Sequence, residues 1–170
     1  MGSVLLPIGS AIFPDGSTNN VAPLLTRIKS TGSDPRPFFL QLEFDPSTPN
    51  LVHWHFRMPN DFISNPILKV QWKTSVTSGN VVWESKIMAY HVGSDTDSVD
   101  ARSFSTSNST TTGAPGTTAG QLVETSITLS NNGSLASKDF MILMLRRIAD
   151  NGSDTCTGNG KVVAVTLEYS

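Results

Sequence analysis

The sequence predicts an all-β protein: an antiparallel β-sandwich of the jelly-roll type with an extended N-terminal arm. Two observations support this fold class. Several segments alternate apolar and polar side chains with the two-residue period of a half-buried strand, and no segment sustains the 3.6-residue period of an amphipathic helix. Turn-rich connections separate the alternating segments into about eight strands. An immunoglobulin-like sandwich is the competing topology, because periodicity does not give strand order.

Length and composition limit the partners that the chain can have. A chain of 170 residues suits one domain and buries about 70% of the surface that it exposes when unfolded. Only 15% of the residues are charged and the formal net charge is -2, so nucleic acid is not expected as a partner. No apolar stretch approaches a membrane span, and the single cysteine, Cys156, allows neither an intramolecular disulfide nor a Cys-rich metal site.

Residues 1–37 are predicted to form the extended arm and residues 38–170 the sandwich. The arm holds half of the ten prolines of the chain, between short apolar clusters such as Val4–Leu6 and Leu24–Leu25. Proline has no amide donor and holds its predecessor extended, so the arm is expected to add edge strands or to run across a surface. A strand that closes its own sandwich and an arm that grips a partner are the two alternatives.

Two alternating strands follow the arm, at Phe38–Phe44 and Leu51–Met58. Their inward-facing side chains are predicted to be Phe38, Leu40, Leu42 and Phe44 in the first strand and Val52, Trp54, Phe56 and Met58 in the second. His53, His55 and Arg57 then face outward. Pro59 ends the second strand.

Residues 67–92 are predicted to form a long hairpin about the turn Thr77–Asn80. In the register expected for this hairpin, Trp72 and Trp83 are diagonal neighbours on one face. Two indole rings on an isolated hairpin would expose a large apolar area, so a second sheet is expected to cover them.

The remaining chain adds a polar loop and three strands. Residues 93–120 are rich in Ser, Thr, Asp, Gly and Asn and are predicted to be mostly loop, with Phe104 as an anchor. Gln121–Leu129 and Lys161–Tyr169 alternate like the earlier strands. Asp139–Ile148 is apolar on both faces, so a second layer is expected outside the core, either the arm or another subunit.

Two groups of side chains were weighed as metal ligands. His53 and His55 share a strand face, but no third ligand has a matching spacing, so a polar face or an interface is the preferred interpretation. Asp95, Asp97 and Asp100 resemble the start of a calcium loop that lacks the glycine and the distal glutamate of the EF-hand. An acidic turn is preferred there, with a weak calcium site as the alternative.

The sequence contains no nucleophile elbow and no Ser, His and Asp set apart by spacing. It therefore predicts a protein that is not an enzyme and that uses no cofactor, and an enzyme of the jelly-roll type is the least favoured reading. Arg146 and Arg147 point to opposite faces of a strand, so at least one guanidinium is expected in solvent or in an interface.

Several segments together resemble a group of small all-β structural proteins of tailed bacteriophages. They are Trp54–Pro59, Leu68–Trp72, Gly79–Trp83, Thr118–Leu122, Ser126–Leu129, Arg147–Thr155 and Lys161–Val165. The resemblance covers roughly Leu51–Ser170 and consists of core residues and turns, so it bears on the fold more directly than on the role. The arm lies outside it.

The resemblance implies a virion component on the outer capsid surface, of the cement or decoration type. Such a protein forms a homotrimer and clamps neighbouring copies of the major capsid protein. The residues expected to contact another subunit or the capsid are Leu5, Leu6, Ile12, Phe13, Leu24, Leu25, Met141, Leu143, Leu145 and Arg147. The alternative function is a phage tail or fibre module that binds a host surface glycan.

Overall fold

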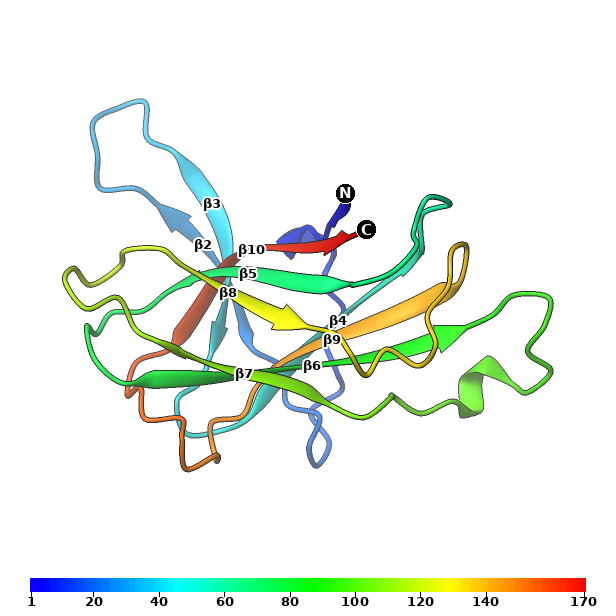
Figure 1. The fold of residues 1–170 in the computed structure, drawn as a ribbon. Coiled ribbons are helices and arrows are strands. Elements are labelled where there is room, and N and C mark those ends of the chain that lie inside the picture. Colours follow the sequence, from blue (N-terminus) through cyan, green and yellow to red (C-terminus); the bar gives the residue numbers. More distant parts are fainter.

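The computed structural model describes the whole chain, Met1–Ser170 (Figure 1). Its strands are β1 (Gly2–Leu5), β2 (Leu24–Lys29), β3 (Phe38–Phe44), β4 (Asn50–Arg57), β5 (Ile67–Lys73), β6 (Asn80–Tyr90), β7 (Asn108–Gly113), β8 (Val123–Thr128), β9 (Phe140–Arg147) and β10 (Gly160–Tyr169). Two short 3-10 helices, η1 (Ile8–Ser10) and η2 (Val99–Ala101), complete the fold. No helix has the length and apolar character needed to span a membrane. The all-β prediction is confirmed.

The strands form two antiparallel sheets. The order is β2-β3-β10-β5-β8 in the first sheet, where β1 also pairs with β10, and β4-β9-β6-β7 in the second. From β3 to β10 each sheet receives four strands, and every connection except that from β6 to β7 crosses to the other sheet. This is the double Greek-key order of a jelly roll, so the predicted jelly-roll topology is confirmed.

The predicted hairpin at residues 67–92 is wrong, because its two strands belong to different sheets. β5 pairs with β10 and β8, whereas β6 pairs with β9 and β7. Gly79 allows the chain to cross between the sheets: its φ is +89°, and a Cβ there would lie 2.6 Å from the carbonyl oxygen of Thr155. The alternation of apolar and polar residues shows which face of a strand is buried. It does not show whether two successive strands pair within one sheet or lie in opposite sheets.

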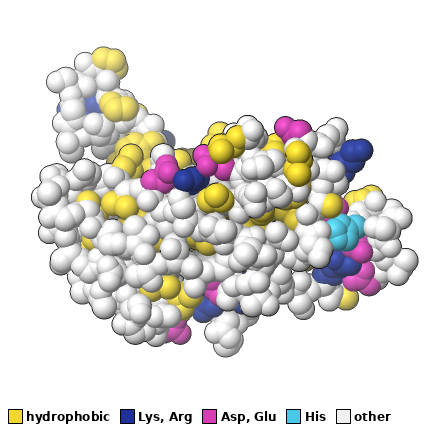
Figure 2. Space-filling model, in the orientation of Figure 1, with side chains coloured by type: hydrophobic (Ala, Val, Ile, Leu, Met, Phe, Trp, Pro, Cys, Tyr) yellow, Lys and Arg dark blue, Asp and Glu magenta, His cyan; other side chains and the backbone are white.

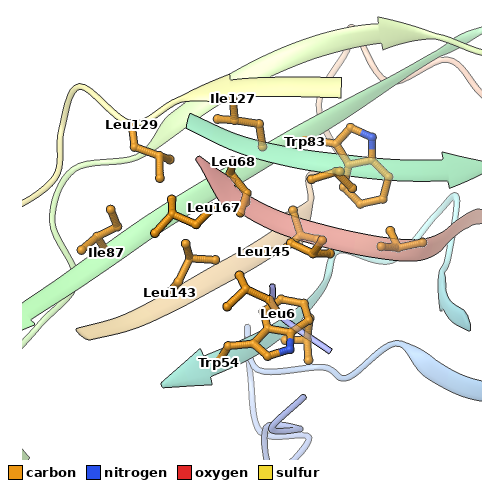
Figure 3. Close-up of a cluster of buried hydrophobic side chains, with 14 of the residues drawn as sticks. Leu6, Trp54, Leu68, Trp83, Ile87, Ile127, Leu129, Leu143, Leu145 and Leu167 are labelled. Atoms are coloured by element: carbon orange, nitrogen blue, oxygen red, sulfur yellow. The ribbon is translucent and has the colours of Figure 1, made fainter. Parts of the chain in front are cut away.

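The core lies between the two sheets, and the three tryptophans lie in it as expected. Trp72 and Trp83 face each other from opposite sheets, with ring centroids 5.8 Å apart, and Phe44 meets the ring of Trp83 edge-on at 5.1 Å. The indole nitrogen of Trp54 donates a hydrogen bond to the carbonyl of Pro7. Figure 3 shows Leu143 and Leu145 of the second sheet around Leu167 of the first, and Trp54 beside Leu6 of the N-terminal segment.

One apolar residue on the outer side of β9, Met144, is covered by the chain itself. Met144 lies between His53 of β4 and Lys86 of β6 in the strand register, and its exposed fraction is 4%. Phe104 folds back from the 93–107 loop and stacks on His53 at 5.5 Å, so it anchors that loop as the sequence predicted. A second subunit is therefore not required to cover Met144.

The N-terminal segment lies along its own sandwich. β1 pairs with the C-terminal part of β10, from Gly2 opposite Tyr169 to Leu5 opposite Thr166. Further along, Ile12 exchanges two backbone hydrogen bonds with His53 at the outer edge of β4, at 2.8 and 3.0 Å. The segment thus extends one sheet and borders the other.

Arg147, at the end of β9, is completely buried. Its guanidinium makes two hydrogen bonds of 3.0 and 2.7 Å to the carboxylate of Asp154, whose side chain is also buried. It also donates to the carbonyl oxygens of Phe44, Cys156 and Gly158. Arg146 points the opposite way, as expected, and pairs with Glu84 at 3.4 Å.

We predict that Arg147→Met lowers the free energy of unfolding by about 3–5 kcal/mol, because it leaves the Asp154 carboxylate buried without its cation. Urea unfolding followed by tryptophan fluorescence measures this change. Arg36→Gln is the control and should cost less than about 1 kcal/mol, because Arg36 pairs with Asp34 in solvent, where the two side chains are 37% and 79% exposed. Equal losses for the two variants would contradict the role given to Arg147.

Candidate docking surface

The exposed large apolar side chains gather near the N-terminus and on β3. Those between residues 5 and 40 are Leu5, Ile12, Phe13, Leu24, Leu25, Phe38, Phe39 and Leu40. We call the set on strands β2 and β3, which is Leu24, Leu25, Phe38, Phe39 and Leu40, the hairpin surface. Figure 2 shows hydrophobic side chains on the projecting hairpin and where it joins the sandwich.

The hairpin projects because only its base belongs to the sheet. β2 pairs with β3 along its whole length, from Leu24 opposite Glu43 to Lys29 opposite Phe38. β3 in turn pairs with β10 only from Leu42 to Phe44. The half of the hairpin that carries Phe38 therefore extends beyond the other strands, as Figure 1 shows at the upper left.

This projection corrects the sequence prediction for two side chains. Phe38 and Leu40 were expected to point inward with Leu42 and Phe44, but their exposed fractions are 56% and 38%. They do lie on the strand face that leads into the core, because Leu42 and Phe44 are completely buried. No strand of the second sheet reaches far enough to cover Phe38 and Leu40.

Two shallow hollows flank Phe39 on the outer face of the first sheet. One, of about 320 Å³, is lined by Leu5, Leu6, Pro7, Ile8, Gly9, Phe39, Leu40, Val163 and Ala164. The other, of about 350 Å³, is lined by Phe39, Lys73, Gly120, Leu122 and Val163. A β-bulge at Val163 in β10 contributes to both. The hairpin surface thus continues onto the sheet as an apolar groove.

Positive charges border the hairpin surface. The ammonium of Lys73 lies 4.6 Å from the ring centroid of Phe39, and Arg27 and Lys29 each lie 5.9 Å from that of Phe38. Burial, together with the nearby charge of Lys161, lowers the pKa of Lys73. An apolar surface edged by cations suits a protein partner with apolar and acidic side chains.

Glu43 anchors the base of the hairpin. Its carboxylate accepts hydrogen bonds from Thr26 of β2, Gln41 of β3 and Asn159 beside β10, at 2.9, 2.8 and 3.2 Å. Burial raises the pKa of Glu43, but these hydrogen bonds and the charge of Lys161 outweigh that effect and hold the pKa below its ordinary value. The carboxylate therefore ties three segments together while it is ionised.

The structure separates the ten predicted contact residues into two groups. Leu5, Ile12, Phe13, Leu24 and Leu25 are exposed. Leu6, Met141, Leu143, Leu145 and Arg147 are buried, and the last four have no exposed surface at all. The contact prediction is wrong for this second group, because the inner face of β9 is used by the core and Arg147 by its own ion pair.

Three of the candidate metal ligands, His53, Asp95 and Asp97, have other partners. His53 stacks on Phe104, and burial lowers the pKa of its imidazole. Asp95 and Asp97 both contact the guanidinium of Arg102, at 2.6 and 2.8 Å. The sequence analysis missed Phe38, Phe39 and Leu40 as surface residues, and the cations on the neighbouring strand were the signal that could have suggested their exposure.

Comparison with known proteins shows the fold. No protein-family model and no curated protein sequence matches the chain. Among solved structures, a family 35 carbohydrate-binding module from Clostridium thermocellum is similar over 100% of both chains, with a TM-score of 0.51 and 13% identity. A module specific for non-crystalline cellulose matches over 93% of this chain and 84% of its own, with a TM-score of 0.46 and 10% identity, too distant to support an argument. The first similarity supports the jelly-roll sandwich and, at this identity, nothing finer.

We predict that Glu43→Gln lowers the free energy of unfolding at pH 7 by about 1–2 kcal/mol, because hydrogen bonds to a neutral acceptor are weaker than those to a carboxylate. A carboxylate with a depressed folded pKa stabilises the protein above its unfolded pKa and loses this effect as the pH falls through the folded pKa. The difference in the free energy of unfolding between the wild type and Glu43→Gln should therefore disappear as the pH falls below about 4.

Urea unfolding of both proteins between about pH 3 and 7 measures this difference in the free energy of unfolding. Asp100→Asn is the control: this exposed carboxylate forms no ion pair, so the variant should match the wild type throughout. A difference in the free energy of unfolding between the wild type and Glu43→Gln that stays constant with pH would contradict the role given to the carboxylate.

Proposed function

We propose that the chain is a structural protein of a tailed-bacteriophage virion, a cement or decoration protein that docks on the outer capsid surface and clamps neighbouring major capsid proteins. The observation that carries the proposal is the projecting hairpin surface, with Leu24, Phe38 and Phe39 exposed at 63%, 56% and 39%. The role is binding, and the resemblance of residues 51–170 to phage virion proteins supports the same class.

The energetics of such a contact are favourable. Complete burial of one Phe or Leu side chain contributes about 1.5–3 kcal/mol, and clustered aromatic anchors commonly dominate an interface. Phe38 and Phe39 are adjacent strand residues, so they point to opposite faces of the hairpin. A hairpin inserted at the junction of two capsid subunits would place one phenyl ring against each, and separating the subunits would then expose both.

The proposal includes a homotrimer on the capsid. Because the inner face of β9 is buried, the subunit contact is assigned to the exposed N-terminal residues, such as Leu5, Ile12 and Phe13. Equilibrium sedimentation should show a trimer, and a monomer at high concentration would remove this part of the proposal without affecting capsid docking.

We expect the purified protein to co-sediment in stoichiometric amounts with capsids that lack it. The double variant Phe38→Ser/Phe39→Ser should weaken this binding at least tenfold, because the exposed parts of the two rings together equal about one side chain, whose burial contributes about 1.5–3 kcal/mol. Ile63→Ser is the matched control, since Ile63 is an 82% exposed apolar residue outside the hairpin surface. Full binding by the double variant, or no binding by the wild type, would overturn the proposal.

The second candidate is a phage tail or fibre module that binds a host glycan. The fold similarity to a carbohydrate-binding module favours it. The burial of Trp54, Trp72 and Trp83 weighs against it, because none of these indoles is available to stack on a sugar. Strand β7 (Asn108–Gly113) interrupts the segment 93–120 that the sequence predicted to be mostly loop. A glycan-array signal that disappears when exposed residues of the 93–107 loop are substituted would support this candidate, and a signal that persists would not.

A further inference from the structure

A polar cleft lies at the end of the sandwich away from the hairpin surface. Its volume is about 620 Å³, and it is lined by Arg57, His91, Val92, Ser94, Ala136, Ser137, Lys138, Asp139 and Phe140. In Figure 1 the segments that follow β6 and precede β9 lie at the right, opposite the β2–β3 hairpin. Figure 2 shows a histidine with basic and acidic side chains beside it at the same end.

Three strand ends bring the lining residues together. Arg57, the last residue of β4, lies opposite Phe140, the first residue of β9, and Phe140 also lies opposite Tyr90 at the end of β6. His91 follows Tyr90 directly. The loop before β9 is held by two backbone hydrogen bonds with Met58, at 3.2 and 2.9 Å. The cleft is therefore built on the regular part of the fold.

The cleft presents cations that have no partner within the chain. Arg57 and Lys138 are exposed and take part in no ion pair. The one carboxylate in the lining, that of Asp139, is buried, accepts a hydrogen bond from the amide of Ala136 at 2.7 Å and lies 2.8 Å from Nδ1 of His91. These contacts fix the imidazole and leave its Nε2 available for a ligand.

Two acidic groups in the loop that follows His91, those of Asp95 and Asp97, are also engaged. Asp95 accepts a hydrogen bond from the backbone amide of His91 and pairs with Arg102 at 2.6 Å. Asp97 is held by the same guanidinium. The charges still available in the cleft are therefore positive, and they belong to Arg57 and Lys138.

We propose that this cleft binds a small acidic saccharide through its anionic group. The planar guanidinium of Arg57 matches a carboxylate or phosphate with two parallel hydrogen bonds, and the ammonium of Lys138 adds a second positive charge. The hydroxyls of Ser94 and Ser137 suit the hydroxyl groups of a sugar, while Phe140 supplies an apolar wall for a ring face. A volume of about 620 Å³ lies within the range of small-molecule sites.

The cleft and the hairpin surface can be occupied at the same time. Because they lie at opposite ends of the sandwich, a protein docked through the hairpin would present the cleft at its free end. The saccharide site does not depend on the capsid proposal, so either one can fail while the other stands.

Isothermal titration calorimetry on the full-length protein tests the site. The ligands are glucuronate and galacturonate for the carboxylate arm, glucose 6-phosphate for the phosphate arm, and glucose, acetate and inorganic phosphate as controls. At least one acidic saccharide should bind at millimolar concentrations and more tightly than any control. Arg57→Gln and Lys138→Gln should each weaken binding about tenfold, the effect of losing one charge-assisted contact.

Arg27→Gln is the matched variant, because it removes the same charge from the hairpin and should leave saccharide binding unchanged. Circular dichroism on each variant checks that the exposed substitutions leave the fold intact. Three outcomes would overturn the proposal: no binding of any acidic saccharide, equal binding of acetate or inorganic phosphate, or binding that both cleft variants retain in full.

Discussion

The buried ion pair between Arg147 and Asp154 is the interaction on which one end of the sandwich depends. The guanidinium reaches the carbonyl of Phe44 on β3, and the carboxylate accepts from the amide of Val82 on β6 as well as from Arg147. β3 and β6 belong to different sheets, so the pair joins them across the core. Several hydrogen bonds offset the desolvation of both groups. Because these bonds require specific positions of the carbonyl and amide partners, the pair fixes how the two sheets are placed at this end.

The same ion pair also fixes the strand that carries the candidate docking surface. Phe44 is the last residue of β3, in the part of the strand that pairs with β10, and the hairpin projects from the residues before Leu42. Glu43, next to it, fixes β2 and the segment before β10 to the same point. The exposed phenyl rings of the hairpin are thus held by a rigid base, which lowers the entropy lost when they are buried against a partner.

The sequence predicted the strands well and their neighbours poorly. Phe38–Phe44 was predicted with the bounds that the structure shows, because alternation is a local property. The pairing of β5 and β6 was wrong, since crossing to the opposite sheet depends on the fit of Gly79 beneath Thr155, a contact between residues far apart in the chain. Arg147 was predicted to contact a partner, and its burial was missed because two of the carbonyls that accept its hydrogen bonds, those of Cys156 and Gly158, come from the loop that follows it.

For the candidate sites, too, the sequence predicted local features and missed those that depend on strand pairing. Leu5 and Leu24 are exposed, as the sequence predicted, but the same proline-rich segment also buries Leu6 in the core. Predicting the exposure of Phe38 requires knowing where β3 separates from β10, and predicting the cleft requires knowing that three strand ends meet at Phe140. A jelly roll places its connecting loops at the two ends of the sandwich, so residues distant in sequence converge there, and a surface built at such an end is visible only once the strand order is known.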